Sequence, residues 1–439
     1  MKITALHLYP VAIADPPLRS SYGLHAPYAL RTIVEIETDE GIRGCSETYG
    51  GEQPLAQLQA AREKLIGRDV FQLTSLLMEF EAQAQQETSG VEGDRSQTWH
   101  VPGENPLDRH SRTFAAIEIA CLDAIGKAWN KPLCDLLGGR ARSEAPFSAY
   151  LFYKHRGGGG LGEDERPDEY GEALTPEAIV RQAHQMIQKY GFREIKLKGG
   201  VLDPELEVET IRALRREFGP ALPLRIDPNC AWSVETSVKV GQQLAEELSG
   251  GGYLEDPCAG LEGMAEVRKR LLADGISTPL ASNVAVTSFA HIPQAWKLGA
   301  VQIVLSDPHY WGGLRAQLQL DHFCSVLGLG LSMHSNNHLG VSLMAMAHAA
   351  AACPHLNFAC DTHYPWQTEQ DEVVLGGRIP FHNGSVRIPE KGGLGVELDY
   401  DQLARLGERY EKLPYRKRDD EAEMRKRVDP NWRRVLPRW

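Results

Sequence analysis

The chain has 439 residues, of which 42% are hydrophobic and 24% are charged, a composition typical of a soluble globular protein with a large core. Its formal net charge of −12 argues against a nucleic-acid-binding surface, although a local pocket can still be basic enough for an anionic substrate. No apolar run reaches the ~18 residues of a membrane span, the first residues lack the features of a signal peptide, and the eight cysteines form no CxxC pair. We therefore expect a cytoplasmic protein without membrane or nucleic-acid partners.

The first 140 residues predict an α+β domain. Apolar and polar residues alternate on both sides of Asp39, Glu40 and Gly41, a pattern typical of a β-hairpin. From about residue 61 the pattern becomes helical, and the stretch "TFAAIEIACLDAIGKAW" is apolar along most of one side. We expect residues 1–140 to form one domain.

Residues 141–365 predict a parallel (β/α)8-type barrel, in which short apolar runs alternate with amphipathic helices. The runs are "FSAYLFY", "EIKLKGG", "LPLRIDPN", "GGYLEDP", "TPLASN", "VQIVLSDPH", "LGLSMHSN" and "LNFACDTH". A glycine-rich stretch at 156–171 interrupts the first connection and predicts a mobile loop. We expect residues 366–439, which include a hairpin pattern, to return to the first domain and complete a cap over the barrel.

Polar residues stand where six successive apolar runs stop, at intervals of 24 to 29 residues. A single Asp or Asn at a strand end is more often a helix cap, and a single His is more often a hydrogen-bonded residue. Six such residues, each at the end of an apolar run, favour an active site instead, because the active site of a barrel lies at the carboxyl ends of its strands. These six residues are Lys198, Asp227, Glu255, Asn283, Asp307 and His334.

Three of these residues predict a magnesium site. Asp227, Glu255 and Asn283 follow consecutive runs and offer only oxygen ligands. Mg²⁺ prefers such oxygens and keeps positions open for water or substrate, whereas zinc would favour cysteine or histidine. Mg²⁺ would act there as a Lewis acid toward a carboxylate or enolate oxygen.

Two acid/base groups are expected to flank that metal. Lys196 and Lys198 lie two residues apart, so they share one face of a strand and disfavour each other's charge. This repulsion would help to lower a lysine pKa from about 10.4 toward the ~7–8 that suits a general base. We expect Lys198 to lie deeper as the base and Lys196 to lie nearer the substrate carboxylate. On the other side, a carboxylate at Asp307 would fix the tautomer of His334 and raise its basicity.

The order and the motifs of these residues are similar to the D-glucarate dehydratase family, in the mandelate racemase branch of the enolase superfamily. The resemblance covers nearly the whole chain and rests on "YGFREIKLKGGVL", "IDPNCAWS", "LEDPC", "SDPHYW", "HSNNH", "DTHYPWQ", "PEKGGLGVELD" and "CLDAIGKAWNKPLCDLLGG". It implies Mg²⁺-assisted removal of the proton α to a carboxylate, followed by β-elimination of hydroxide. The resemblance also implies a homo-oligomer.

By the same resemblance, Lys198 is the base for D-glucarate. His334, oriented by Asp307, is the base for L-idarate and the acid for the leaving hydroxyl. The metal ligands are those given above. The implied contacts to the acid sugar are His25, Tyr150, Lys196, Asn229, Ser335, Asn336, His363 and Arg418.

The sequence departs from the family pattern in three places. Residues 109–113 give no clear match to the small hydroxyl residue expected in the cap, so that contact is unassigned. The loop at 156–171 differs in length and composition, and the tail around Arg418 is only weakly similar. Another aldarate or aldonate, dehydrated or epimerised, is therefore an alternative substrate. A Schiff-base aldolase would fit the lysine pair alone and would leave the three oxygen ligands unused. A non-catalytic barrel is the remaining alternative.

Overall fold

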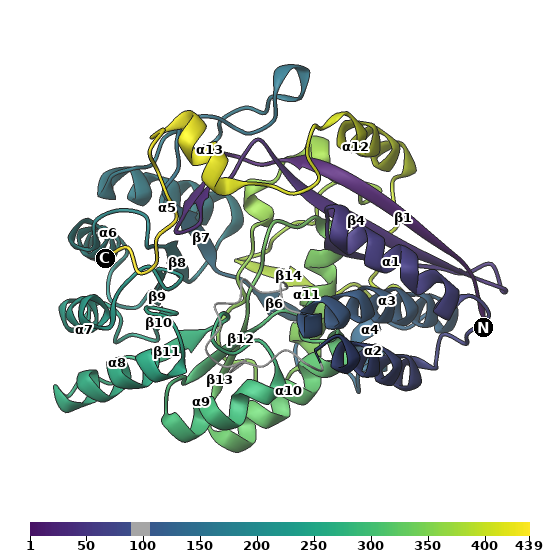
Figure 1. Ribbon diagram of the computed structural model, residues 1–439, viewed down its shortest axis with the longest axis horizontal. Coiled ribbons are helices and arrows are strands. Elements are labelled where there is room, and N and C mark those ends of the chain that lie inside the picture. The colour runs from purple at the N-terminus through teal and green to yellow at the C-terminus, as the bar shows by residue number, and fades with distance from the viewer. Residues whose placement is uncertain (89–105) are drawn as a thin grey trace.

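An antiparallel sheet with helices on one face forms the first part of the chain in the computed structural model, which describes residues 1–88 and 106–439 (Figure 1). The strand order is β1-β4-β5, and the predicted hairpin joins the last two strands. The bounds are β1 (Ile3–Ala14), β4 (Tyr28–Thr38), β5 (Arg43–Tyr49), α1 (Glu52–Leu65), α2 (Leu73–Thr88), α3 (Pro106–Trp129) and α4 (Leu133–Leu136).

A parallel sheet of seven strands follows, and its strands are neighbours in chain order, from β7 to β13. Parallel neighbours need a crossover, and a helix supplies it after each of these strands. The strands are β7 (Ala149–Phe152), β8 (Ile195–Lys198), β9 (Leu224–Asp227), β10 (Tyr253–Glu255), β11 (Leu280–Ser282), β12 (Ile303–Ser306) and β13 (Gly330–Met333). The helices are α5 (Pro176–Tyr190), α6 (Pro204–Phe218), α7 (Val234–Gln243), α8 (Leu261–Ala273), α9 (Ile292–Leu298), α10 (Leu314–Leu327) and α11 (Gly340–Ala352).

The eighth apolar run closes the barrel without forming a regular strand. On one side, the backbone N–H of Asp361 donates to the carbonyl of Met333 at the end of β13 (2.8 Å). On the other side, the N–H of Ser148 donates to the carbonyl of Cys360 just before β7 (2.9 Å). The run therefore lies between the first and last strands and pairs with both. The predicted barrel is confirmed, with a short irregular segment in place of its eighth strand.

The C-terminal segment returns to the first sheet, as predicted. α12 (Tyr400–Lys412) packs on β1, with Tyr410 against Tyr28 and Ala12. α13 (Asp420–Arg427) packs on a small hairpin of β2 (Arg19–Ser20) and β3 (Gly23–Leu24). Figure 1 shows both yellow helices beside the purple N-terminal strands. A further strand, β14 (Ser385–Arg387), pairs with β6 (Glu144–Pro146). The cap thus combines the N-terminal strands with α12 and α13, whereas the last residue, Trp439, hydrogen-bonds with Ala231 and Ser233 in the loop after the barrel strand β9.

The glycine-rich loop at 156–171 is anchored, in contrast to the mobile loop that its composition predicts. The ammonium of the buried Lys154 donates to Asp168 (2.7 Å), whose second oxygen accepts from the N–H of Gly157 (2.7 Å). Gly159 has a φ of +87°, and a Cβ there would lie 2.4 Å from the backbone of Asp15. Glycine is therefore required for the loop to pack directly against the cap.

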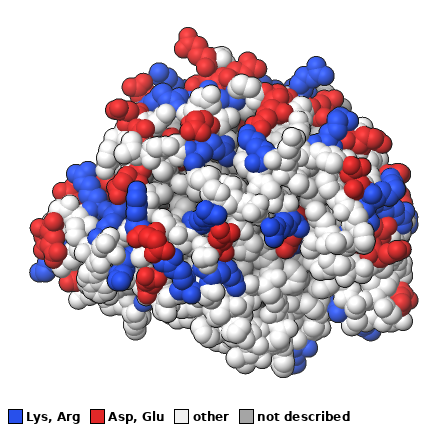
Figure 2. Space-filling model, turned by 180° about the vertical axis from the view of Figure 1, so that it is seen from behind, with Lys and Arg blue, Asp and Glu red and all other residues white. Residues whose placement is uncertain are grey.

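Charges of both signs are mixed on the molecular surface. On the face in Figure 2, acidic and basic side chains alternate around a wide uncharged area in the lower part of the view. None of the helices within residues 1–88 and 106–439 is long and apolar enough to cross a membrane. The side chains that could take part in a reaction lie instead inside the molecule, at the carboxyl ends of the parallel strands.

Candidate active site

Lys196 lies among three buried carboxylates. Its Nζ is 2.5 Å from Asp361 Oδ2 and 2.6 Å from Glu255 Oε2, and Asp227 Oδ2 is 3.6 Å away. Burial opposes the charged form of this lysine, but Asp361 and Glu255 raise the pKa of Lys196 well above its ordinary value. The strand accepts two neighbouring ammonium groups because carboxylates surround them.

Lys198 is the less buried of the two lysines, which corrects the expectation that it lies deeper. Its side chain is 8% exposed, whereas that of Lys196 is 0% exposed. Lys198 is the last residue of β8, and a residue two positions earlier lies about 6–7 Å further from the strand end. Its Nζ donates to Asp227 Oδ2 over 2.7 Å. The expected lowering by mutual repulsion also fails for Lys196, because the carboxylates outweigh the neighbouring ammonium.

The three predicted metal ligands lie on neighbouring strands and are connected. Asp227 ends β9, Glu255 ends β10 and Asn283 follows β11, and all three are buried. In the amide orientation that satisfies its hydrogen bonds, the nitrogen of Asn283 donates to Glu255 Oε1 over 3.2 Å. Both Asp227 and Glu255 lie against the ammonium of Lys196. The parallel sheet thus brings together side chains that are about 28 residues apart in the sequence.

The electrostatics of this group fit a divalent cation. Burial, and then the charge of Asp227, raise the pKa of Glu255 well above its usual range. Burial also opposes ionisation of Asp227, but Lys198 and Lys196 hold its pKa at about 2. Carboxylates crowded in this way are stabilised by an added positive charge. Within residues 1–88 and 106–439, no three His, Cys, Asp or Glu side chains are grouped to hold a metal ion, so a site built on Asp227 and Glu255 would use an oxygen of another kind, such as the amide oxygen of Asn283.

Asp256 fixes the turn that carries Asn283. Its carboxylate accepts from the hydroxyl of Ser282 (2.5 Å) and from the backbone N–H groups of Asn283 (2.9 Å) and Val284 (3.1 Å). Burial, with a further contribution from Asp227, raises the pKa of Asp256 to about 6. Asp256 therefore fixes the backbone position of Asn283, one of the three predicted metal ligands.

His334 and Asp307 meet on neighbouring strands, as predicted. His334 follows β13 and Asp307 follows β12, and His334 Nδ1 lies 3.3 Å from Asp307 Oδ2. The other ring nitrogen, Nε2, lies 3.3 Å from the amide oxygen of Asn283. The phenol of Tyr49, from the cap strand β5, donates to the same Asp307 oxygen over 3.0 Å. Burial opposes ionisation of Asp307, but His309 and His334 keep its pKa far below its ordinary value.

A row of rings lines the side of the site next to β7. The phenol of Tyr150 donates to Asp227 Oδ2 (3.2 Å), and its ring packs against Phe152 and His363, with centroids 4.6 Å and 5.0 Å away. His363 Nδ1 pairs with the hydroxyl of Ser335 over 3.1 Å. Burial, and then the charge of His25, hold the pKa of His363 well below its usual value, which keeps the ring neutral.

The cap contributes a charged cluster around Asp15. This buried carboxylate accepts from Arg418 (2.6 Å) and from the amide of Asn337 (2.9 Å), and it lies 3.5 Å from His25 Nδ1. Arg418 also pairs with Asp420 over 2.6 Å. Both predicted cap contacts, His25 and Arg418, thus belong to one cluster. Each of them has a carboxylate partner within the protein.

The remaining predicted contacts lie on the same rim. Asn229 follows β9 with a φ of +47°, and its N–H donates to Asp227 Oδ1 (3.0 Å). The amide nitrogen of Asn336 donates to the phenol of Tyr49 (3.4 Å). In the cap helix α3, the hydroxyl of Thr113 donates to the backbone carbonyl of Arg109 in its own helix (3.0 Å).

Family sequence models match two parts of the chain. The "Mandelate racemase / muconate lactonizing enzyme, N-terminal domain" matches residues 17–138, and the "Enolase C-terminal domain-like" family matches residues 178–403, which is more than half of the chain. The chain belongs to the mandelate racemase branch of the enolase superfamily.

Individual relatives within this superfamily match along the whole chain. A "Probable glucarate dehydratase" of Streptomyces coelicolor is 45% identical over 443 aligned positions, which cover 100% of this chain and 99% of the relative. A solved enolase of Pseudomonas fluorescens, with bound magnesium, potassium and tartrate, is 46% identical with a TM-score of 0.90 and covers 100% of this chain and 99% of its own. An enolase of Thermobispora bispora, complexed with magnesium and formate, is 46% identical with a TM-score of 0.88 and covers 100% of both chains.

Several residues of the site were not predicted from the sequence. Four of them, Asp256, His309, Asn337 and Asp361, stand inside motifs beside predicted residues, where strand ends could have revealed them, and Phe152 shares a strand face with Tyr150. The other two, Tyr49 and Asp15, come from the cap and leave no local signal. The seven residues are Asp256, His309, Asp361, Phe152, Tyr49, Asp15 and Asn337.

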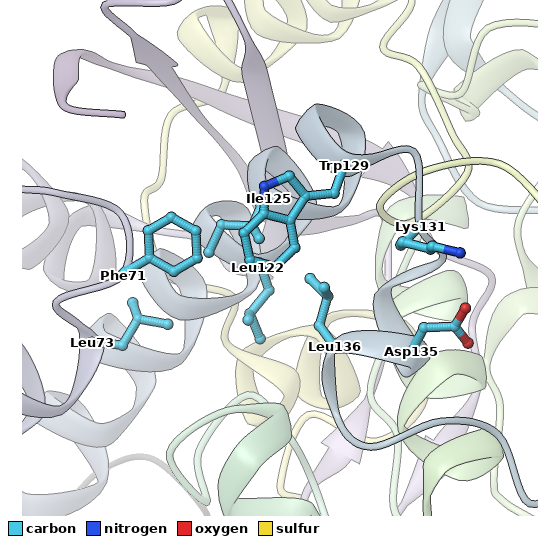
Figure 3. Close-up of a pocket in the computed structure, with 8 residues that line it drawn as sticks. All are labelled: Phe71, Leu73, Leu122, Ile125, Trp129, Lys131, Asp135 and Leu136. Carbon is cyan, nitrogen blue, oxygen red and sulfur yellow. The ribbon is translucent and has the colours of Figure 1, made fainter.

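A cavity of about 560 Å³ in the cap is a separate feature (Figure 3). Its walls come from α3, α4 and the start of α2, and the rings of Phe71 and Trp129 approach to 5.3 Å at its edge. None of its lining residues belongs to the candidate site. They are Phe71, Leu73, Leu122, Ile125, Trp129, Lys131, Asp135 and Leu136. Its mostly apolar lining lacks paired acid/base groups, so the strand ends, and not this cavity, form the candidate active site.

Proposed function

We propose that this protein is a hydro-lyase that dehydrates an acid sugar with Mg²⁺, and that D-glucarate and L-idarate are its substrates, giving 5-keto-4-deoxy-D-glucarate. One observation carries this proposal: Lys198 contacts one predicted metal ligand, Asp227, and His334 faces another, Asn283. The two groups stand on β8 and after β13, which lie on different sides of the ligand strands. Such a site can take a proton from either face of a carbon next to a metal-bound carboxylate.

Asp227, Glu255 and Asn283 would hold the ion, and magnesium in the solved relatives supports this choice of cofactor. Bound there, Mg²⁺ supplies Lewis-acid stabilisation of the negative charge that develops on the substrate carboxylate. The ammonium of Lys196 would donate to the same carboxylate. Its burial excludes water and strengthens this interaction.

The proton movements use two side chains. Lys198 Nζ, in its neutral form, accepts the α-proton of D-glucarate. His334 Nε2 donates a proton to the hydroxyl that leaves the neighbouring carbon, so the substrate loses one water. For L-idarate, with the opposite configuration at the α-carbon, His334 Nε2 accepts the α-proton instead. Asp307 holds the imidazole through Nδ1 and so keeps Nε2 directed toward the substrate.

The far end of the substrate would meet the cap. His25 and Arg418 would contact the distal group, with Tyr150, Asn229, Ser335, Asn336 and His363 along the chain of hydroxyls. Tartrate is itself a hydroxylated diacid, and its presence in a solved relative supports a diacid substrate for this protein.

A second candidate is an aldonate, whose distal end is a hydroxyl. Arg418 is already paired with Asp15 and Asp420, so its positive charge is largely compensated. This pairing favours a neutral distal group unless the substrate displaces one carboxylate. The reaction would otherwise be the same.

A screen of purified protein with Mg²⁺ against six-carbon and five-carbon aldarates and aldonates tests the proposal. Product is followed as a 2-keto-3-deoxy acid, and α-proton exchange in D₂O is followed by NMR. We expect dehydration of D-glucarate and L-idarate at higher kcat/KM than of any aldonate. Dehydration of aldonates alone would favour the second candidate, and no exchange with any acid sugar would reject both. A homo-oligomeric assembly, a cytoplasmic location and the domain boundaries near residues 140 and 365 remain predictions.

A further inference from the structure

Asp307 accepts hydrogen bonds from two imidazole rings. His334 lies at Oδ2, and His309 Nδ1 lies 2.5 Å from Oδ1, which also accepts from the backbone N–H of His309 (2.8 Å). All three side chains are buried. An ionised carboxylate can only accept hydrogen bonds, so Nδ1 of each ring carries the proton that faces Asp307.

The far side of the His309 ring is held as well. Its Nε2 lies 2.7 Å from the hydroxyl of Ser342 in the first turn of α11. The backbone N–H of Ser342 donates in turn to Glu47, a buried residue of the cap strand β5 (2.9 Å). The ring is therefore fixed at both nitrogens, and the neutral tautomer with its proton on Nδ1 satisfies both contacts.

We propose that His309 is a positioning residue for His334, acting through Asp307. By holding Oδ1, the His309 ring leaves Oδ2 directed at His334 and Tyr49, and so fixes the tautomer and orientation of the reactive imidazole. This inference rests on the proposed function, in which His334 serves one face of the substrate and Lys198 serves the other. Lys198 has no contact with Asp307 among those described, so the loss of His309 should affect only one face.

The variants His309→Ala and His309→Asn separate positioning from general support of the fold. An asparagine places its amide nitrogen close to where Nδ1 of histidine stands, so it can still donate to Asp307 Oδ1, whereas alanine cannot. A positioned acid/base group contributes about 10²- to 10⁴-fold to a proton transfer. We therefore expect His309→Ala to slow α-proton exchange of L-idarate by at least ~30-fold. Exchange of D-glucarate should stay within about threefold of the wild-type rate, because it uses Lys198.

In His309→Asn, exchange of L-idarate should return to within about fivefold of the wild-type rate. Both rates are measured by NMR in D₂O on the Mg²⁺-loaded protein, and thermal unfolding checks that each variant folds. Should the alanine variant not fold, His309→Gln replaces it, because its longer side chain moves the amide beyond Oδ1.

The outcomes separate this inference from the proposed function. The role of His309 would be overturned if His309→Ala slowed exchange of both substrates equally, if it slowed neither, or if His309→Asn did not restore exchange of L-idarate. Wild-type exchange rates for both substrates in His309→Ala would leave the proposed function intact. Wild-type protein that exchanges neither substrate would instead reject the function and, with it, this inference.

Discussion

The ammonium of Lys196 lies 2.5 Å from Asp361 Oδ2, and both side chains are completely buried. Asp361 comes from the irregular eighth segment of the barrel, which pairs with β13 on one side and with Ser148, just before β7, on the other. The segment that closes the barrel thus also supplies a counter-ion for the lysine at the centre of the site.

Replacing Asp361 by asparagine should weaken Mg²⁺ binding. Lys196 would lose one of its two close carboxylates, so its ammonium would pair more strongly with Glu255, which is a predicted metal ligand. Loss of a supporting group of this kind reduces metal affinity by roughly 10- to 100-fold. Calorimetric titration with Mg²⁺ measures the effect, and Asp321→Asn, a buried carboxylate on α10, is the control. An unchanged Mg²⁺ affinity in Asp361→Asn would show that Asp361 does not support the metal site.

The metal ligands themselves should be indispensable for turnover. Asp227→Asn or Glu255→Gln should abolish dehydration and Mg²⁺ binding while the protein remains folded by circular dichroism. EDTA treatment of the wild-type protein should have the same effect on activity, and added Mg²⁺ should restore it. Full activity after complete metal removal, verified by elemental analysis, would refute a role for the ion.

Lys198 and His334 should be separable by substrate configuration. With Lys198→Ala, exchange of the α-proton of D-glucarate should vanish while exchange from L-idarate survives, and His334→Asn should reverse this dependence. Dehydration should be lost in both variants with D-glucarate, because His334 also protonates the leaving hydroxyl. NMR in D₂O follows exchange separately from product formation. Wild-type exchange of D-glucarate in Lys198→Ala would show that Lys198 is not the base.

Arg418 should distinguish a distal carboxylate from a distal hydroxyl. A charge-assisted hydrogen bond is stronger than a neutral one, so Arg418→Gln should lower kcat/KM for aldarates by roughly 10- to 100-fold. Values for aldonates should change little. Arg425→Gln, in which the arginine of α13 pairs with Glu421 instead, serves as the control. An equal loss for both classes of acid would place Arg418 outside the specificity site.

The stability of the protein should depend on pH through Glu207. This buried residue of α6 accepts from the backbone N–H groups of Gly200, Val201 and Leu202, in the loop after the lysine strand. Burial raises its pKa from 4.5 to about 7 despite these hydrogen bonds. The native state therefore binds more protons than the unfolded state between these pH values. The free energy of unfolding should fall by about 3 kcal/mol as the pH rises from 4.5 to 7, at about 1.36 kcal/mol per pH unit.

Glu207→Gln should lack this component of the pH dependence. Urea denaturation at several pH values measures it as the difference between wild-type and variant profiles. Glu209→Gln, an exposed position on the same helix, should follow the wild type. A wild-type stability that rises relative to Glu207→Gln between pH 4.5 and 7 would contradict the raised pKa.

The sequence by itself determined the barrel and the identity of its strand-end residues. Asp227, Glu255 and Asn283 could be predicted because each ends a short apolar run, and parallel strands bring their carboxyl ends to one rim whatever the helices between them contain. The pairing of His334 with Asp307 follows from the same rule, since the two runs are consecutive. Local periodicity carries this information, so no knowledge of distant contacts is needed.

Only the tertiary structure decided how these groups are partnered. The depth order of Lys196 and Lys198 depends on where β8 ends, and the charge of Lys196 depends on Asp361, which is 165 residues away. Asp15 and Arg418 meet although 403 residues separate them, and Tyr49 reaches Asp307 from the cap. Such contacts arise when the cap and the barrel pack together, and packing between distant segments leaves no period in the sequence. The environment of each charge, and with it the pKa of each group, is therefore a property of the assembled fold.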